Sequence, residues 1–293
     1  MALVPRIKLF FSFQLMFGLL ASALVISPGQ QQENALVRKG QSFPENVPEV
    51  KASACPRNNP YVANGTLIDQ LWRQNCDVVA RFLNNKFTTW QATTNNKTAT
   101  LPSFQYYSAQ DYYYLVETVQ HKAFLMSSWL PQGYQLPSSI NDTVEEMEGD
   151  LEYAQSFLQD IESKLSIPDS VINQGGLQAD GLGYVKWLSE STELGRYAWQ
   201  VARIACIYGW GELANQLNAS PTTKKGTIFD TEWIQLNLDW SYGDEMSKEF
   251  QANIAYNNSL TFAAYNILFR EGLRFEIAFF ESAIGKTLAD NKQ

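Results

Sequence analysis

Apolar residues recur at intervals of three and four along most of the chain after residue 66, which is the spacing of helices that bury one face. The clearest stripe predicts one long helix over residues 195–217 and is formed by Leu194, Ala198, Val201, Ala205 and Tyr208. Similar stripes predict helices over residues 67–85, 103–130, 142–165, 231–240, 244–257 and 259–287. Polar stretches predict loops at residues 95–102 and 166–182. Runs that alternate Val, Ile and Thr with polar residues are missing, so the pattern predicts an all-α fold.

The composition supports a sizeable hydrophobic core and argues against a nucleic-acid partner. Of the 293 residues, 45% are hydrophobic and 13% are aromatic, and the formal net charge is -8. A protein that follows a phosphate backbone needs clustered Lys and Arg, which this chain lacks. No Walker motif and no dinucleotide-binding glycine motif is present. A nucleic-acid partner is therefore not expected.

The first residues have the layout of a secretory signal peptide. Arg6 and Lys8 precede an apolar run over residues 9–26, and a small-x-small cleavage motif ends at Ala23. We therefore expect a signal peptide at residues 1–23 and a secreted protein. The alternative is a signal-anchored membrane protein, because the apolar run is close to the minimum length that crosses a bilayer.

Residues 24–54 show no apolar periodicity and are expected to form a flexible leader. The folded helical domain is then expected over residues 55–293. Extracellular exposure would allow N-glycosylation, and the predicted sites are Asn64, Asn96, Asn141 and Asn257. A fifth sequon, at Asn218, is weakened by Pro221 close behind it.

The three cysteines divide into a pair and a single thiol. In an oxidising compartment an odd number of cysteines leaves one without a partner. Cys55 and Cys76 lie close together in the sequence and are the expected disulfide, which leaves Cys206 as the free thiol. A buried free cysteine is usually inert packing, so Cys206 has either a packing role or a chemical one.

Two carboxylic acids stand inside apolar helical faces. Asp111 shares a face with Phe104, Tyr107 and Tyr114, so it is either hydrogen-bonded to a tyrosine in the core or oriented toward a ligand. Glu276 interrupts the apolar row of the last predicted helix. It is either paired with an arginine or desolvated, and a desolvated carboxyl has a raised pKa suited to proton transfer near neutral pH.

Five sequence elements, taken in order, resemble the TenA/thiaminase II family, and the resemblance covers roughly residues 104–285. The elements are FQYYSAQDYYYL (104–115), GYVKWL (183–188), ACIYGWGEL (205–213), EWI (232–234) and RFEIAFFESAI (274–284). This resemblance implies a haem-oxygenase-like multi-helical bundle that assembles as a tetramer. It also implies a hydrolase that cleaves aminopyrimidines or thiamin at the exocyclic methylene, releases hydroxymethylpyrimidine, and needs no metal or other cofactor.

The family motifs also imply roles for individual residues. Cys206 matches the nucleophile that adds to the pyrimidine ring, Glu276 matches the acid/base carboxylate, and Asp111 matches the aspartate that hydrogen-bonds the pyrimidine edge. The positions that match the rest of the substrate pocket are Tyr114, Tyr184, Trp210, Glu212, Asn237 and Phe279.

Three departures from the family pattern keep a second interpretation open. Trp210 and Asn237 stand where the family commonly has tyrosines, which removes two phenol hydroxyls from the expected pocket. Most family members are also cytosolic, unlike a protein with a secretory start. The alternative is therefore a secreted protein that binds a pyrimidine-like molecule on the same scaffold without catalysis. Haem or dimetal chemistry needs more histidine ligands than the single His121 of this chain.

Overall fold

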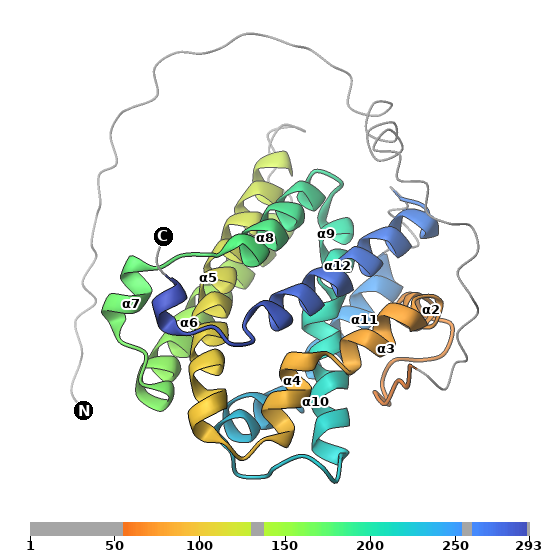
Figure 1. The fold of residues 1–293 in the computed structure, drawn as a ribbon. Coiled ribbons are helices and arrows are strands. Elements are labelled where there is room, and N and C mark those ends of the chain that lie inside the picture. The colour runs from red at the N-terminus through yellow and green to blue at the C-terminus, as the bar shows by residue number, and fades with distance from the viewer. Residues whose placement is uncertain (1–54, 130–137, 254–259, 292–293) are drawn as a thin grey trace, which may run out of the picture. The chain divides into compact units, whose positions relative to one another are not determined.

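The computed structural model describes residues 55–129, 138–253 and 260–291 (Figure 1). Within these ranges every regular element is helical and no β-strand occurs, which confirms the predicted all-α class. The predicted signal peptide and leader, and the sequon at Asn257, lie outside the described residues. Of the described helices, none has the combined length and apolarity needed to cross a bilayer. Asn64, Asn96 and Asn141 are exposed, and their glycosylation stays a prediction.

The elements follow one another without long described loops. In chain order they are α2 (Leu67–Gln74), α3 (Cys76–Leu83), α4 (Lys86–Thr93), α5 (Lys97–Trp129), α6 (Ser138–Leu165), α7 (Asp169–Gln174), α8 (Ala179–Thr192), α9 (Arg196–Ala202), the π-helical turn η2 (Ala205–Gly209), α10 (Trp210–Ala219), the π-helical turn η3 (Asp230–Ile234), the 3-10 turn η4 (Gln235–Asn237), α11 (Ser241–Asn253), α12 (Phe262–Ser282) and the 3-10 turn η5 (Leu288–Asn291).

Helix α12 is the centre of the bundle. It packs against α2, α3 and α4 as well as α8, α9 and η2, and Figure 1 shows it crossing between these two groups. This position explains why its buried face is broader than a single stripe and includes Glu276. Helix α5 packs along α6 and α8 and places its aromatic face against the same core. Burial of each large aromatic side chain contributes about 1.5–3 kcal/mol.

The segment 195–217 is not the single regular helix that its stripe predicts. Helix α9 ends at Ala202, and the chain then makes the π-helical turn η2 before α10 begins at Trp210. A π-helical turn holds an extra residue, so it rotates the side chains after it relative to a regular helix. Gly209 closes this turn against Phe82, whose ring would lie 3.1 Å from a Cβ at that position. Cys206 lies within the turn, and such turns often occur at functional sites.

Other predicted boundaries were also wrong. The predicted helix 67–85 is divided into α2 and α3 at Asn75, and the predicted loop 166–182 contains α7 and the start of α8. The predicted loop 95–102 belongs mostly to α5, which begins after Asn96, whose side chain accepts a hydrogen bond from the Ala99 amide at 3.3 Å. Pro102 is tolerated near the start of α5, where its missing N–H removes one hydrogen bond from a helix of 33 residues.

Gly272 allows α12 to approach α9 closely. A Cβ at this position would collide with the carbonyl oxygen of Ala202. Glu276 lies one helical turn after Gly272, and Ala202 lies just before η2. The glycine therefore determines how close the carboxyl of α12 comes to the thiol of η2.

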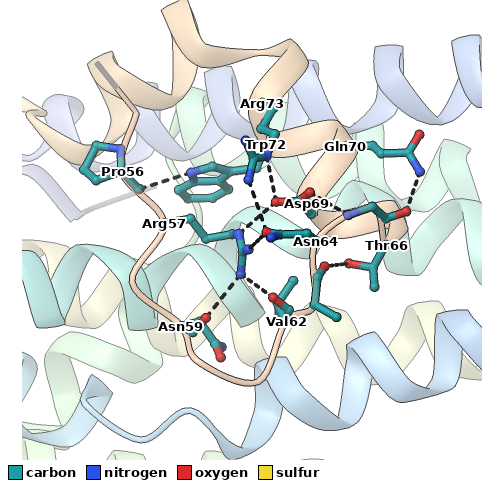
Figure 2. A network of polar contacts seen from close by, with 12 residues as sticks. Pro56, Arg57, Asn59, Val62, Asn64, Thr66, Asp69, Gln70, Trp72 and Arg73 are labelled. Atoms are coloured by element: carbon teal, nitrogen blue, oxygen red, sulfur yellow. Dashed lines mark hydrogen bonds and ion pairs between the residues drawn. The ribbon is translucent and has the colours of Figure 1, made fainter. Parts of the chain in front are cut away.

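The first described segment is fastened to α2 and α3. A disulfide joins Cys55 to Cys76. In the sequence between these cysteines, the Arg57 guanidinium donates to the Asp69 carboxylate at 3.0 Å and to the Asn64 side-chain oxygen at 3.0 Å. Arg73 donates to the same two side chains (Figure 2). Disulfide and ion pairs together hold this segment against the bundle.

Removing the disulfide should lower stability without disturbing the rest of the core. For the Cys55→Ser, Cys76→Ser variant we expect the free energy of unfolding to fall by about 3 kcal/mol, because the bond closes a loop with a sequence separation of 21 residues in the unfolded chain. Urea unfolding of the oxidised and substituted proteins measures the difference. An unchanged unfolding midpoint would mean that the Arg57 network alone holds the segment.

Candidate active site

Side chains from four parts of the chain meet around the π-helical turn. Cys206 comes from η2, Glu276 from α12, Tyr184 from α8, and Asp111 and Tyr114 from α5. Asp111 and Glu276 lie close enough to the Cys206 sulfur for their charges to raise its pKa. A thiol, two acids and two phenols therefore share one site, and only the packing of distant helices brings them together.

Glu276 is a buried acid held by two donors. Its side chain belongs to a residue that is 1% exposed. The Tyr184 hydroxyl donates to one carboxyl oxygen at 2.8 Å, and the Trp210 indole N–H donates to the other at 3.0 Å. Burial raises the pKa of Glu276 to about 7, although both hydrogen bonds and the Arg203 charge act to lower it. Glu276 can therefore both accept and donate a proton near neutral pH.

Cys206 is a free and partly buried thiol. Its sulfur donates to the Arg203 carbonyl oxygen at 3.2 Å and lies 3.3 Å from the Tyr114 hydroxyl. Burial raises the pKa of the thiol to about 11, and the Arg203 charge and the Tyr114 hydroxyl oppose this shift. The thiol therefore needs a proton acceptor in order to react as a thiolate at neutral pH.

Asp111 has an unused acceptor. The residue is 5% exposed, and its Oδ1 atom has no hydrogen-bond partner among the described residues. Burial and the nearby Glu276 carboxylate raise the pKa of Asp111 well above its usual range. A buried oxygen without a partner is costly in a folded protein, and a ligand that donates a hydrogen bond would remove the cost.

Aromatic rings enclose these polar groups. Tyr114 stacks on Tyr184 with ring centroids 5.2 Å apart, and Tyr184 stacks on Phe275 at 5.4 Å. Phe279 lies 6.2 Å from Tyr114. Trp210 packs with its ring centroid 5.8 Å from that of Phe280, and its indole N–H donates to the Glu276 oxygen that Tyr184 does not contact. The polar groups of the site therefore lie among aromatic side chains.

Seven of the predicted site residues contribute to this cluster, and two do not. The seven are Cys206, Glu276, Asp111, Tyr114, Tyr184, Trp210 and Phe279. The predicted pocket residue Glu212 instead faces the first segment, where its carboxyl accepts from the amides of Asn58 and Asn59 at 2.7 and 3.0 Å and from Tyr208 at 2.6 Å. The side-chain amide of Asn237, in η4, donates to the main-chain carbonyl oxygen of Trp233, in η3, at 2.8 Å.

Ordinary helical spacing accounts for where these two side chains lie. Glu212 lies six residues after Cys206, so the two side chains are on different faces of the helical segment, and Glu212 shares its face with Tyr208. Asn237 lies four residues after Trp233, so its side-chain amide can reach the Trp233 carbonyl oxygen one turn earlier.

Sequence reasoning missed two members of the site, Arg203 and Phe275. Arg203 lies three residues before Cys206, so on a helix the two residues are neighbours, and this spacing could have identified it. Phe275 precedes Glu276 directly, and adjacent residues on a regular helix point in different directions. Its contact with Tyr184 depends on how α8 packs on α12, which no local pattern shows.

The site holds no obvious metal-binding group. Among the described residues, no three His, Cys, Asp or Glu side chains are grouped as ligands of one ion. His121 is buried against the Trp199 ring, and burial lowers its pKa to about 4.

Known structures share this fold. No family model and no curated sequence matches the chain. Solved structures do match it. One is a TenA homologue from P. horikoshii OT3, with 17% sequence identity and a TM-score of 0.61, and the match covers 75% of this chain and 98% of the homologue. A TenA family transcription regulator from Silicibacter sp. TM1040 has 16% identity and a TM-score of 0.58, with coverages of 75% and 97%.

A third solved structure also matches the chain. A protein from Sulfolobus solfataricus P2, provisionally named a TenA-like thiaminase, has 20% identity and a TM-score of 0.55, with coverages of 75% and 97%. The described chain therefore has the haem-oxygenase-like fold of the TenA proteins, as the sequence resemblance implied.

Proposed function

We propose that this protein is a thiaminase II-like hydrolase that cleaves aminopyrimidines related to thiamin, or thiamin itself, at the exocyclic methylene. The observation that supports it most strongly is the combination of Cys206, Glu276 and Asp111 in one aromatic site. A free thiol, a carboxyl with a pKa of about 7 and a buried acceptor without a partner have little packing value together.

In the proposed reaction, the pyrimidine binds between the aromatic rings, with its amino edge toward Asp111. The Cys206 sulfur loses its proton and forms a bond to a ring carbon, and a ring nitrogen takes up a proton. The ring's electrons then expel the amine or thiazole from the methylene carbon. Water adds to this carbon, the carbon–sulfur bond breaks, and the aromatic ring and the thiol are restored. Glu276 carries the protons between these steps, for which its pKa is well matched.

The Trp210 departure is compatible with this mechanism. A tyrosine at this position would donate a hydrogen bond through its hydroxyl, and Trp210 donates one to Glu276 through its indole N–H at 3.0 Å. The donor is preserved while the ring becomes larger. Trp210 therefore alters the shape of the substrate pocket more than the chemistry of Glu276.

The proposed setting is extracellular, where the substrate would be thiamin or its breakdown products. The secretory start predicted for residues 1–23 and the exposed sequons Asn64, Asn96 and Asn141 support this part of the proposal. A homotetramer is proposed from the family resemblance.

The test is to incubate the purified protein with aminomethylpyrimidine and, separately, with thiamin, and to measure hydroxymethylpyrimidine by chromatography. We expect release from at least one of the two compounds. If neither is cleaved but hydroxymethylpyrimidine raises the thermal unfolding temperature, the protein is a pyrimidine-binding protein without catalysis. If neither cleavage nor stabilisation occurs, the pyrimidine assignment is wrong.

A further inference from the structure

Arg203 is a partly buried cation that forms no ion pair with the described residues. It follows the last residue of α9, and its guanidinium lies over the Trp199 ring, 4.4 Å from the ring centroid. Its Nε atom is buried without a hydrogen-bond partner, and no carboxylate of the described residues lies within ion-pair distance. A partly buried charge in this position needs a counter-charge.

The neighbouring carboxylates are committed elsewhere. Asp150 lies close enough to interact with Arg203, but it pairs with Lys122 at 2.7 Å. The two oxygens of Glu276 already accept hydrogen bonds from Tyr184 and Trp210. Two groups beside Arg203 can still become anions, the Cys206 thiol and the Tyr114 hydroxyl, and burial raises the pKa of Tyr114 well above its ordinary value.

Arg203 is connected to this thiol in two ways, through its own main-chain carbonyl and through Tyr114. The neutral S–H donates to the Arg203 carbonyl oxygen at 3.2 Å. The sulfur also lies 3.3 Å from the Tyr114 hydroxyl, and this hydroxyl interacts in turn with the Arg203 guanidinium. When the thiol loses its proton, it loses the bond to the carbonyl and can accept one from Tyr114. The guanidinium then faces a negative charge across a single hydroxyl.

We propose that Arg203 is the cation that stabilises the Cys206 thiolate, and that the Tyr114 hydroxyl connects the two. This role deepens the proposed function, because it rests on Cys206 as the nucleophile. The other titratable groups around the sulfur are Asp111 on α5, Tyr184 on α8 and Glu276 on α12. All three are acids, so none of them can replace the guanidinium.

Alkylation of Cys206 by iodoacetamide tests this role without any substrate. Below the pKa of a thiol, the alkylation rate follows the small fraction of thiolate, which changes tenfold for each unit of pKa. At pH 8 we expect Arg203→Met to react about tenfold more slowly than the wild type. Arg203→Lys should keep most of the rate because it keeps the charge. Mass spectrometry follows the reaction, since Cys206 is the free thiol of the chain.

Two further variants separate charge from packing. Trp199→Phe removes the indole beneath the guanidinium but keeps the cation, and it should alkylate within about twofold of the wild-type rate at pH 8. Tyr114→Phe removes only the connecting hydroxyl and should slow alkylation, which gives a second measurement if Arg203→Met does not fold. Thermal unfolding of each variant establishes that the folded protein is being measured.

Two results would overturn the role of Arg203. One is an unchanged alkylation rate in both Arg203→Met and Tyr114→Phe. The other is an Arg203→Lys variant as slow as Arg203→Met, because the charge would then be irrelevant. A slow Arg203→Met variant in a protein that cleaves no pyrimidine would support the thiolate stabilisation and refute the proposed reaction, so the two failures are distinguishable.

Discussion

Cys206→Ala should abolish the release of hydroxymethylpyrimidine, with kcat/KM reduced on the order of 10³-fold or more. The expected size follows from the role of the sulfur, which forms the covalent bond that makes the amine or thiazole leave. Alanine leaves no other nucleophile in its place, because the side chains around it are the acids and phenols of Asp111, Glu276, Tyr114 and Tyr184. Steady-state kinetics with the better of the two substrates measures the loss.

A matched control comes from the same turn. Ile207 follows Cys206 in η2, is partly buried and carries no polar group, so Ile207→Val should retain the wild-type activity. Hydroxymethylpyrimidine should still raise the thermal unfolding temperature of Cys206→Ala, because the aromatic walls and Asp111 remain. A Cys206→Ala enzyme with near wild-type kcat/KM would exclude covalent catalysis by this residue.

Glu276→Gln should reduce kcat/KM by about 10²–10³-fold and alter its pH dependence. In the wild type, kcat/KM should rise with pH through the Glu276 pKa of about 7 and fall again as the Cys206 thiol, with a pKa of about 11, ionises. The profile is bell-shaped because the reactive site holds one proton between the two groups. An ionised Glu276 takes this proton from the thiol and passes it to the ring nitrogen, and a site that has lost it can no longer protonate the ring. Glutamine cannot ionise, so the variant should lose the acidic limb of the profile.

The same substitution should increase stability at alkaline pH. The pKa of Glu276 is higher in the folded protein, about 7, than its ordinary value of 4.5, so ionisation favours the unfolded chain. The stability of the wild type should therefore decline as the pH rises from 4.5 through 7, by an amount on the order of 3 kcal/mol. Glutamine avoids this cost, since it can accept from Trp210 and donate to the Tyr184 oxygen.

Urea unfolding of the wild type and Glu276→Gln at pH 4.5 and pH 8 measures this effect. We expect similar stability at pH 4.5 and a more stable variant at pH 8. Glu281→Gln is the matched control, because Glu281 lies on the same helix but is partly exposed and 3.8 Å from Arg81. If Glu276→Gln is less stable than the wild type at both pH values, the carboxyl is a structural hydrogen-bonding group and its raised pKa has no role in the reaction.

The fold class followed from periodicity because helices that bury one face impose a three- and four-residue spacing on apolar side chains. The same spacing failed at residues 195–217, where a stripe continues through a π-helical turn without showing it. The extra residue of η2 is favoured by contacts with Phe82 and α12, which lie far away in the sequence. Glu212, which follows this turn, is bonded to the amides of Asn58 and Asn59 in the first described segment.

For the site, the sequence predicted an unpaired thiol and two acids on apolar helical faces. It left open whether each of them has a packing role or a chemical one. An acid at a buried helical position reads the same in sequence whether it meets an arginine or an empty acceptor site. The structure shows that Asp111 Oδ1 has no partner among the described residues and that Glu276 accepts from Tyr184 and Trp210, because hydrogen bonds depend on neighbours from other helices.

The amino-acid sequence alone determined which helical faces are buried, which cysteine lacks a partner, and which acids stand on apolar faces, because each of these is a local or a counting property. Only the tertiary structure decided that the thiol, the two acids and Arg203 share one site, and that Glu212 does not. The physical reason is that pKa values and hydrogen bonds arise from the approach of separate helices, such as α12 against α9 at Gly272.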